Sequence, residues 1–397
     1  MIYDDGHNNP YEAGKVIAAI HKTAASEDAV NSALEELDYE KAAYLFRSNR
    51  AEEESDALDI ILIHLNDKDQ TAVIEAIEQL SAHPYVAYAE PDYLEELYVL
   101  PNDPLYGELW GMQSIRAPLA WNYTMGSDQI AVGIIDSGID HTHPDIRENM
   151  WVSPDGRLSN GWNFADNDPF SMDINGHGTH VAGTVGAVGN NHIGVAGVCW
   201  RVKIVSLKFG LDIASAIASI YFANQFNIPI LNASWGGPSY SRALKYAIDH
   251  YNGLFIASSG NNGTNNDDFP IYPASYHSNN IISVAAINPH HTLASFSNFG
   301  FESVDIAAPG TNILSLDLNG GYSPQNGTSM AAPHVAGAAA LLKAYMPNLS
   351  ALNLKNIILS SAARIPSLTG KVLTGGMLHV NDMFELANCW RRNGLQA

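Results

Sequence analysis

Residues 326–342 read NGTSMAAPHVAGAAALL, a polar turn that leads directly into a helix built almost entirely from small apolar residues. Ser329 stands where this helix is expected to begin. Its hydroxyl could accept a hydrogen bond from the free amides at the helix start, or it could act as a nucleophile held at that position. The stretch alone leaves both roles open, and the rest of the chain has to decide between them.

Around this helix, apolar runs alternate with helical patterns over most of the chain. Strands are expected near residues 130–135, 202–207, 229–233, 253–257 and 281–285, and helices near 177–187, 213–226, 239–251, 329–345 and 350–362. The runs are apolar on both faces, as is typical of strands covered by helices on two sides. This order predicts an α/β fold with a doubly wound parallel sheet.

The beginning of the chain differs from the rest in charge and in pattern. Residues 1–100 contain 22 of the 42 acidic and 6 of the 20 basic residues, so their net charge is −16 against −6 for the remainder. The pattern predicts strands and helices in the order βαββαβ, which is typical of a ferredoxin-like α+β domain. The expected strands are 15–20, 41–47, 57–65 and 85–90, and the expected helices are 26–37 and 70–81. The segment PNDPLYG then marks a boundary, so we expect one domain over 1–100 and another over 101–397.

Composition excludes several classes of protein. The 397 residues are 46% hydrophobic and carry a net charge of −22, which allows a large core but offers little basic surface for nucleic acid. No stretch approaches the roughly 20 apolar residues of a membrane span, and the first residues lack the pattern of a signal peptide. We therefore expect no nucleic-acid or membrane partner. A monomer is expected as well. Cys199 and Cys389 are expected to be two buried thiols and not a disulfide.

Three distant stretches carry residues suited to acyl transfer. AVGIIDSGIDHTHPD places Asp136 at the end of an expected strand, and NGHGTHVAGTVGAV places His177 between two glycines at the start of an expected helix. Taken singly, Asp136 could be only a helix cap or a turn residue. A carboxylate on one ring nitrogen would let an imidazole at a helix start act as a base near neutral pH. Such a base could accept the proton of Ser329, whose hydroxyl is otherwise a weak nucleophile.

The motifs DSGIDHTHPD, NGHGTHVAG and GTSMAAPHVAG, in this order, resemble the signature blocks of subtilisin-like serine peptidases. The similarity runs from about residue 101 to 385. It implies a serine endopeptidase that works through an Asp136, His177, Ser329 triad and a covalent acyl-enzyme. The family's oxyanion-hole asparagine falls on Asn261 in IASSGNNG, where it would act together with the backbone N–H of Ser329. An asparagine between glycine-rich turns can also be only a turn residue.

The segment NASWGGPS at 232–239 resembles the edge to which an extended peptide substrate adds as a strand in this family. The resemblance implies that Trp235 narrows the pocket for the fourth residue before the scissile bond. Ile271 falls near the floor of the primary pocket, which predicts a preference for apolar side chains. Only FGLD separates Lys208 from Ile213, so one wall of the cleft is expected to be partly missing. The substrate-binding residues implied are Ser234, Trp235, Gly236, Gly260 and Ile271.

Calcium is the expected cofactor, and no organic cofactor is expected. The loop VGNNHIGV resembles the strong calcium site of the family, with mixed side-chain and carbonyl oxygens as ligands. The residues implied in this site are Asp103, Asp145, Val188, Asn191, Ile193 and Val195. The loop ADNDPFSMDIN offers Asp166, Asp168 and Asp173 as a second candidate. Ordinary Asx turns are the alternative explanation for both loops.

The first domain ends in HPYVAYAEPDYLEEL, which resembles the end of the inhibitory propeptide of these peptidases. The resemblance implies that this domain inhibits the enzyme, that its tail runs through the cleft, and that autocleavage falls between about Glu96 and Leu100. A chain that kept the domain would be latent. The family is often extracellular, whereas no export signal is visible. We therefore expect either that the native start is missing or that the enzyme acts inside the cell.

Two other hypotheses remain open. The segment HTHPD at 141–145 matches the start of metallo-β-lactamase zinc sites, which would make the chain a zinc-dependent hydrolase. That site needs a further histidine or aspartate directly after Asp145, and Ile146 stands there. Alternatively, the chain could be a catalytically silent scaffold that binds peptides without turnover.

Overall fold

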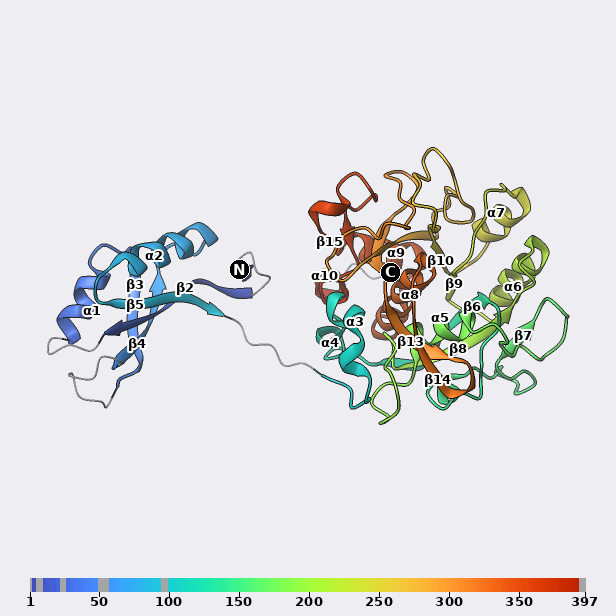
Figure 1. The fold of residues 1–397 in the computed structure, drawn as a ribbon, viewed down its shortest axis with the longest axis horizontal. Helices are drawn as coiled ribbons and strands as arrows, with labels where there is room; N and C mark the ends of the chain where they lie inside the picture. Colours follow the sequence, from blue (N-terminus) through green and yellow to red (C-terminus); the bar gives the residue numbers. More distant parts are fainter. Residues whose placement is uncertain (1, 5–9, 22–25, 49–56, 94–98, 393–397) are drawn as a thin grey trace. The chain divides into compact units, whose positions relative to one another are not determined.

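The chain forms two compact units, Met1–Leu97 and Tyr98–Ala397 (Figure 1). The boundary between them lies three residues before the expected one. The computed structural model describes residues 2–4, 10–21, 26–48, 57–93 and 99–392. None of the helices that it describes combines the length and the apolar character that a membrane span needs.

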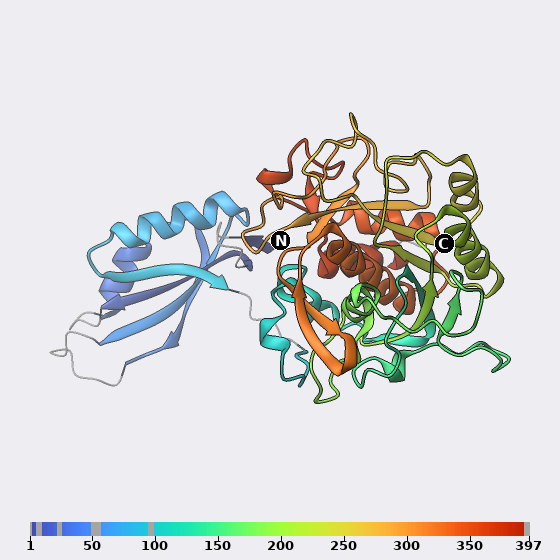
Figure 2. The same ribbon diagram turned by 45° about the vertical axis from the view of Figure 1, so that its right-hand side comes forward.

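The N-terminal unit is an antiparallel sheet packed against two helices, and α2 lies along the sheet in Figure 2. Its strands are β1 (Ile2–Asp4), β2 (Pro10–His21), β3 (Tyr39–Phe46), β4 (Leu58–Leu65) and β5 (Val86–Tyr93). Its helices are α1 (Ser26–Leu34) and α2 (Gln70–Ala82). The order βαββαβ is present as predicted, and only the short β1, which pairs with the start of β2, was not expected.

The sequence pattern of this unit explains its layers. Along β4, Ile61, Ile63 and Leu65 are buried and alternate with half-buried residues, because one face of the sheet carries the helices. The helix α2 begins after Asp69, whose carboxylate accepts a hydrogen bond from the N–H of Ala72 at 2.8 Å. Local capping and alternate burial therefore specify the same small α+β fold.

The second unit contains eleven strands and eight α-helices among the residues described. The strands are β6 (Gly126–Asp136), β7 (Gly161–Asn163), β8 (Arg201–Lys208), β9 (Ile230–Ala233), β10 (Leu254–Ser258), β11 (Ile281–Ile287), β12 (Ile306–Pro309), β13 (Ile313–Asp317), β14 (Gly321–Gln325), β15 (Ala363–Arg364) and β16 (Gly376–Met377). The helices are α3 (Trp110–Ser114), α4 (Ala117–Ala120), α5 (His177–Gly186), α6 (Ile213–Gln225), α7 (Arg242–Asp249), α8 (Thr328–Tyr345), α9 (Ala351–Ser360) and α10 (Val380–Arg392). Short 3₁₀ turns lie at Tyr106–Glu108, Arg147–Asn149, Leu318–Gly320 and Pro366–Leu368.

The main sheet has the order β15-β16-β12-β11-β10-β9-β6-β8-β7, and every pair except β15 with β16 is parallel. The five expected strands form its contiguous middle, from β11 to β8. All residues of β10 and β11 are buried, as strands covered on both faces should be. The predicted doubly wound parallel sheet is confirmed. After β6 the chain forms β7 and β8 on one side of that strand and then crosses to β9 on its other side. A crevice is therefore expected at the carboxyl end of β6.

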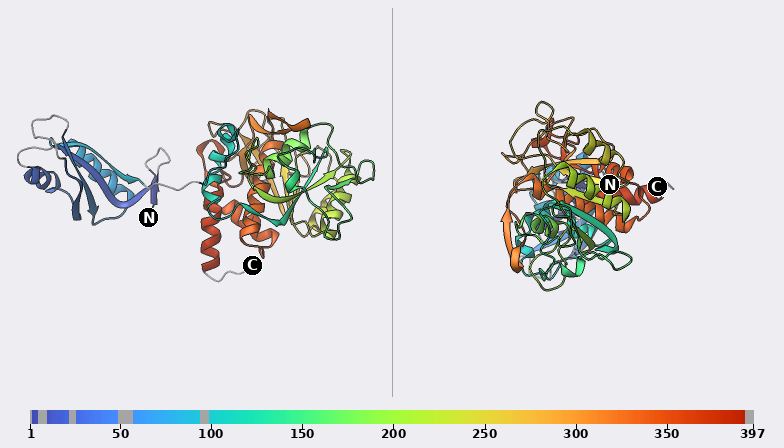
Figure 3. Two further views of the ribbon diagram at one scale, coloured as in Figure 1. Left: turned by 90° about the horizontal axis from the view of Figure 1, so that it is seen from below. Right: turned by 90° about the vertical axis from the view of Figure 1, so that its right-hand side faces the viewer.

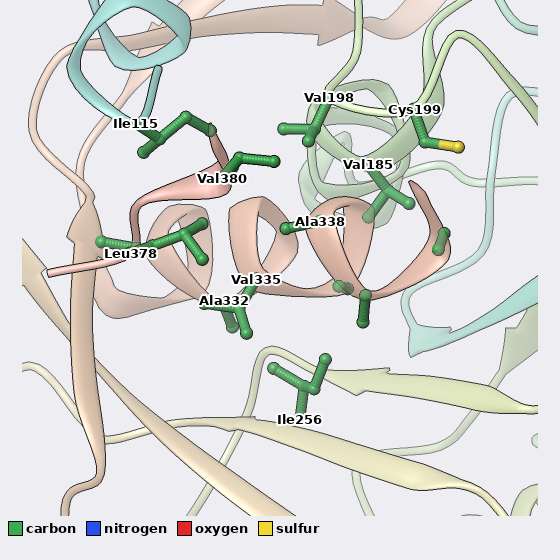
Figure 4. Packing of buried hydrophobic residues seen from close by; sticks show 14 of the residues in the cluster. Ile115, Val185, Val198, Cys199, Ile256, Ala332, Val335, Ala338, Leu378 and Val380 are labelled. Carbon is green, nitrogen blue, oxygen red and sulfur yellow. The ribbon is translucent and has the colours of Figure 1, made fainter. Parts of the chain in front are cut away.

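The helix that begins at NGTSM is the central helix of this unit. α8 is buried over residues 328–342. In Figure 4, Ala332 lies on the side of the helix that faces Ile256 of β10. On another side, a Cβ added at Gly337 would lie only 2.6 Å from Cβ of Val198. Small side chains are therefore needed for α8 to fit between the sheet and its neighbours.

The periodicity did not predict several elements outside the middle of the sheet. These include the short hairpin β13–β14, orange in Figure 2, and the 13-residue C-terminal helix α10, the red helix close to the C-terminus in Figure 3. Neither cysteine forms a disulfide, and Cys199 is buried as expected. Cys389 is exposed, so that expectation was wrong. Because α10 buries Met383, Phe384 and Ala387 on one face, position 389 falls outside that face.

Two imidazoles lie in the core where α5 and α8 pack together. Nε2 of His180 donates to the carbonyl oxygens of Ile313 and Ser323, at 2.9 and 3.0 Å. Nδ1 of His334 donates to the carbonyl oxygen of Met330 at 2.8 Å. Burial lowers the pKa of each histidine to about 4. Both are therefore neutral in the folded protein at neutral pH.

We expect this unit to lose stability as the pH falls from about 6.5 toward 4. In that pH window His180 and His334 are protonated in the unfolded chain but stay neutral in the folded chain. A falling pH therefore favours the unfolded state. Shifts of this size correspond to roughly 3 kcal/mol for each histidine. Thermal unfolding of a Ser329→Ala variant, followed by circular dichroism between pH 4 and 7, measures the effect. A melting temperature that stays constant over this range would contradict it.

Candidate active site

Asp136 and His177 meet at the carboxyl end of the central strand. Asp136 is the last residue of β6, and His177 is the first residue of α5. The two side chains form a hydrogen bond of 2.8 Å between Nδ1 of the imidazole and Oδ1 of the carboxylate. A Cβ at Gly178 would lie 2.1 Å from the carbonyl oxygen of Gly138, so a glycine is required there for α5 to approach β6 this closely.

The electrostatic surroundings of His177 suit a base. Burial disfavours the charged ring, but the hydrogen bond and the charge of Asp136, with a further contribution from Asp173, raise the pKa of His177 above its ordinary value. Asp136 is 4% exposed, whereas the side chain of His177 remains 32% exposed. The ring is therefore held from the interior and open on its outer side.

Ser329 is the second residue of α8 and does not cap it. The capping position is Gly327, which has no side chain to offer, and the first amide, that of Thr328, donates to Oδ1 of Asn261 at 2.8 Å. The hydroxyl of Ser329 donates to the carbonyl oxygen of Ser234 at 3.0 Å. The hydroxyl of Ser234 in turn donates to the carbonyl oxygen of Ser329 at 2.8 Å. Among the described residues, Ser329 has no hydrogen bond to His177.

The side-chain amide of Asn261 is held in one orientation. Its Oδ1 accepts from the N–H of Thr328 and also from the hydroxyl of Thr328, at 3.0 Å. The same hydroxyl accepts from the N–H of Gly260 at 3.1 Å. A Cβ at Gly327 would lie 3.4 Å from Nδ2 of Asn261 and 3.5 Å from the backbone nitrogen of Ser329, so these two donors border one small space. Such a pair can hold a negatively charged oxygen.

Thr328 was not identified from the sequence. Its hydroxyl is buried and links Asn261 to Gly260, so it orients the amide without facing the small space itself. The signal that could have found it is its position directly before Ser329, where a threonine at the helix start has both a donor and an acceptor to offer.

The site opens into a cleft of about 470 Å³ lined by Asp136, His177, Ser234 and Trp235 together with the segment 208–211. An adjoining space of about 350 Å³ shares Phe209, Leu211 and Trp235 with it. The indole is fixed by its N–H, which donates to the carbonyl oxygen of Ile135 at 2.9 Å, and by the ring of Phe209 at 4.8 Å. The cleft wall between Lys208 and Ile213, which was expected to be partly missing, is thus short, but Phe209 and Leu211 give it two apolar side chains.

The remaining predicted substrate residues lie together. A Cβ at Gly236 would lie 2.8 Å from Cγ2 of Ile271, and one at Gly260 would lie 3.5 Å from Cγ1 of the same residue. Gly237, the next residue along, exchanges two hydrogen bonds with Tyr272, at 2.8 and 2.9 Å. The edge after β9 and the segment around Ile271 therefore border one region, as a peptide-binding groove requires.

The carboxylates of the first calcium candidate are buried side by side. Asp145 accepts from the amide of Asn191 at 2.7 Å and from the N–H of Val195 at 2.9 Å, and Asp103 accepts from the N–H of Asn190 at 2.6 Å. Burial raises the pKa of both carboxyls, and the charge of Asp103 adds to the effect on Asp145. Oδ1 of Asp103 is buried and has no hydrogen-bond partner among the residues that the structure describes. The backbone N–H of Val188 donates to the carbonyl oxygen of Asp145. The backbone N–H of Ile193 donates to Oδ1 of Asn191.

In the described part of the chain, the three carboxylates of the second calcium candidate do not form one group. Asp166 and Asp168 accept hydrogen bonds from Asn163 within one turn, whereas the two oxygens of Asp173 are both bound near the start of α5. Within the described part of the chain, no three histidine, cysteine or acidic side chains form a group that could hold a metal. The zinc hypothesis therefore has no support, because both ring nitrogens of His143 are bound, to the N–H of Asp145 and to the carbonyl oxygen of Gly321.

Comparisons with known proteins agree with this geometry. The model of the Subtilase family matches residues 127–384. Thermophilic serine proteinase of Bacillus sp. (strain AK1) is 39% identical over 279 residues, which are 68% of this chain and 66%, just under two thirds, of that protein. Subtilisin BL of Lederbergia lenta is 37% identical over 266 residues, 65% of this chain and 92% of its own.

A solved structure agrees as well. It is titled as a protease from Pseudoalteromonas arctica PAMC 21717, and it matches with a TM-score of 0.63 and 27% identity over 73% of this chain and 100% of that one. The family match covers more than half of the chain, and it includes the strand that ends at Asp136 and the helices that carry His177 and Ser329. The chain therefore belongs to the subtilase family of subtilisin-like serine endopeptidases.

Proposed function

We propose that the chain hydrolyses peptide bonds through Asp136, His177 and Ser329, with a covalent acyl-enzyme as intermediate. The observation that carries the proposal is the 2.8 Å hydrogen bond between His177 and the buried Asp136, in a cleft that is also lined by Ser234, the residue that exchanges two hydrogen bonds with Ser329. A base that is oriented by a carboxylate can accept the proton of a serine hydroxyl.

The steps follow from these positions. The hydroxyl of Ser329 turns from the carbonyl of Ser234 toward Nε2 of His177, gives up its proton there, and its oxygen bonds to the substrate carbonyl carbon. Asp136 stabilises the imidazolium, and Asn261 Nδ2 and the backbone N–H of Ser329 hold the oxygen that becomes negative. His177 returns the proton to the amine as the C–N bond breaks. Water then repeats the sequence and releases the acid.

Protein or peptide chains are the proposed substrates. An extended chain would add along the edge at Ser234, Trp235 and Gly236 by backbone hydrogen bonds. The apolar surface of Ile271 supports a preference for an apolar residue before the scissile bond. Because most contacts would be made to the backbone, we expect broad tolerance elsewhere in the substrate.

A serine-directed phosphonofluoridate tests the proposal directly. The reagent should attach to Ser329 and to no other serine, as located by mass spectrometry of the digested protein. The Ser329→Ala variant should remain unlabelled. A folded wild-type enzyme, freed of residues 1–97, that takes up no label would instead support a peptide-binding scaffold.

Replacing Asn261 by alanine should lower kcat by about 100- to 1,000-fold, with little change in KM. The amide is exposed and faces the small space beside Ser329, so its loss mainly affects the transition state. Steady-state hydrolysis of a peptide anilide measures both constants. The neighbouring exposed Asn262→Ala is the matched control. A loss seen only in KM would contradict the assigned role.

Calcium is proposed as a structural ion at Asp103 and Asp145. Two neighbouring buried carboxylates, one with an oxygen that has no partner, support a hard divalent cation there. Asn191 would add a side-chain oxygen, and Val188, Ile193 and Val195 would add carbonyl oxygens. When bound, the ion neutralises this buried charge.

Removing calcium should therefore lower the melting temperature. A chelator that removes a cation present at 100 times its Kd costs about 2.7 kcal/mol of stability, or roughly 4 °C for a unit of about 300 residues. Differential scanning calorimetry of the Ser329→Ala protein with and without chelator measures the shift. Asp103→Asn should abolish the sensitivity to chelator. Equal melting temperatures with and without chelator in the Ser329→Ala protein, in which Asp103 is retained, would contradict the proposal.

The N-terminal unit is proposed to be an inhibitory propeptide that the enzyme removes from itself. Its independent fold and its separate acidic charge support this role. The predicted cleavage region, from about Glu96 to Leu100, lies partly outside the described residues. N-terminal sequencing of aged protein should find a new end in that region, whereas Ser329→Ala should keep its original end.

A further inference from the structure

A buried carboxylate ties the end of β6 to the start of α5. Asp173 is 4% exposed, and its two oxygens accept four hydrogen bonds. Oδ1 accepts from the N–H of Asn175 at 2.8 Å and from the hydroxyl of Ser137 at 3.0 Å. Oδ2 accepts from the N–H and the hydroxyl of Thr179, at 3.0 and 2.7 Å. Since Gly176 at the capping position of α5 has no side chain, Asp173 supplies the acceptor for the N–H of Thr179 in the first turn.

The same network reaches the residues next to both members of the Asp136 and His177 pair. Ser137 follows Asp136, and its N–H donates to Oδ1 of that carboxylate at 2.7 Å. The hydroxyl of Ser137 accepts from the N–H of Gly178 at 2.9 Å while it donates to Asp173. The buried side chain of Asp173 thus connects the loop that follows Asp136 with α5, the helix that carries His177.

We propose that Asp173 is a positioning residue that clamps α5 to the end of β6 and so sets the alignment of His177 with Asp136. The proposal rests on the proposed triad, because only a reaction through His177 needs this alignment. A displacement of about 1 Å at a reacting group can cost about 100-fold in rate. Asp173 is not among the residues that line the cleft, so it acts on turnover and not on substrate binding.

Asp173 also contributes its charge. Among the described residues, the titratable groups around His177 are Asp136 from β6, Asp173 itself, His180 from the next turn of α5, Asp317 from β13, whose carboxylate faces the turn before α5, and Lys208 of β8, which is the strand partner of Asp136 and lines the same cleft. A negative charge favours the imidazolium. Removal of the charge at position 173 therefore lowers the pKa of His177 and moves the acid limb of kcat/KM to lower pH. A loss of packing alone would leave that limb in place.

The test compares Asp173→Asn with a matched control. The amide keeps the shape of the carboxylate, but its NH₂ end cannot accept a hydrogen bond. We expect kcat to fall about 10- to 100-fold with KM nearly unchanged, and the acid limb to move to lower pH. The control is Asp140→Asn, at a carboxylate that is also buried but that, within the described part of the chain, accepts from Thr142 and Asn319 alone. It should leave kcat and the acid limb nearly unchanged.

A second variant separates the clamp from the charge. Ser137→Ala keeps the negative charge and the cap at Thr179 but cuts the link from Asp173 to Gly178, so it should lower kcat without moving the acid limb. The positioning role of Asp173 is contradicted if Asp173→Asn loses no more activity than Asp140→Asn, or if the acid limb of its kcat/KM profile does not move. If Asp173→Asn does not fold, an unchanged kcat in Ser137→Ala overturns it. Wild-type enzyme that takes no label at Ser329 overturns the proposed function itself, which is a distinct result because it involves no variant.

Discussion

Replacing Ser329 by alanine should almost abolish proteolysis, with kcat falling about 10⁶-fold, the size of loss known from removal of the nucleophile in a related peptidase. The substitution deletes one oxygen atom from a residue that is 9% exposed and that caps nothing, so the fold should be retained. Release of a chromophore from a peptide anilide at saturating substrate measures the loss.

The matched control for this prediction is Ser323→Ala on β14, which removes another hydroxyl of the same unit and should leave kcat unchanged. Equal melting temperatures of the two variants would show that any difference in activity is chemical. Proteolysis at the wild-type rate in Ser329→Ala would mean that another group attacks the peptide bond, and the proposed mechanism would have to be abandoned.

Replacing Asp136 by asparagine should lower kcat about 10⁴-fold, as the same change does in the triad of another serine peptidase fold. The amide can donate to Nδ1 of His177, which would leave the proton on Nε2, so the ring could no longer accept the proton of Ser329. The loss of negative charge should also lower the pKa of His177 and move the acid limb of kcat/KM to lower pH.

The pH profile distinguishes this effect from a folding defect. Enzyme that is merely less well folded would show a smaller amplitude at every pH with the limb in its original place. Wild-type activity in Asp136→Asn would show that the 2.8 Å contact with His177 has no part in the reaction.

Local patterns predicted the centre of the fold because there the local signal and the tertiary packing agree. β10 and β11 are apolar at every position and are buried at every position. The early part of α8 consists almost entirely of small apolar residues, which is what its place in the core requires. Elements at the edges were missed because they are short, such as the two-residue strands β15 and β16, and depend on tertiary contacts.

The candidate site was predicted unevenly for a similar reason. Residue type and motif order identified Asp136, His177 and Ser329, and the family they indicate is confirmed. The sequence could not show that the first amide of α8, the N–H of Thr328, donates its hydrogen bond to Asn261 and not to Ser329. That hydrogen bond joins residues 67 positions apart. Nor could the sequence separate Asp173 from its acidic neighbours, since only the fold brings Thr179 to its carboxylate.

The most direct test of the account is whether His177 and Ser329 act as one unit. The kcat of Ser329→Ala should be compared with that of the double variant that also carries His177→Ala. If His177 works only by taking the proton of Ser329, the second substitution should cost nothing further, and both variants should retain the same small residual activity. A further large drop in the double variant, equal to the effect of His177→Ala alone, would show that the two residues act independently and would contradict the proposed mechanism.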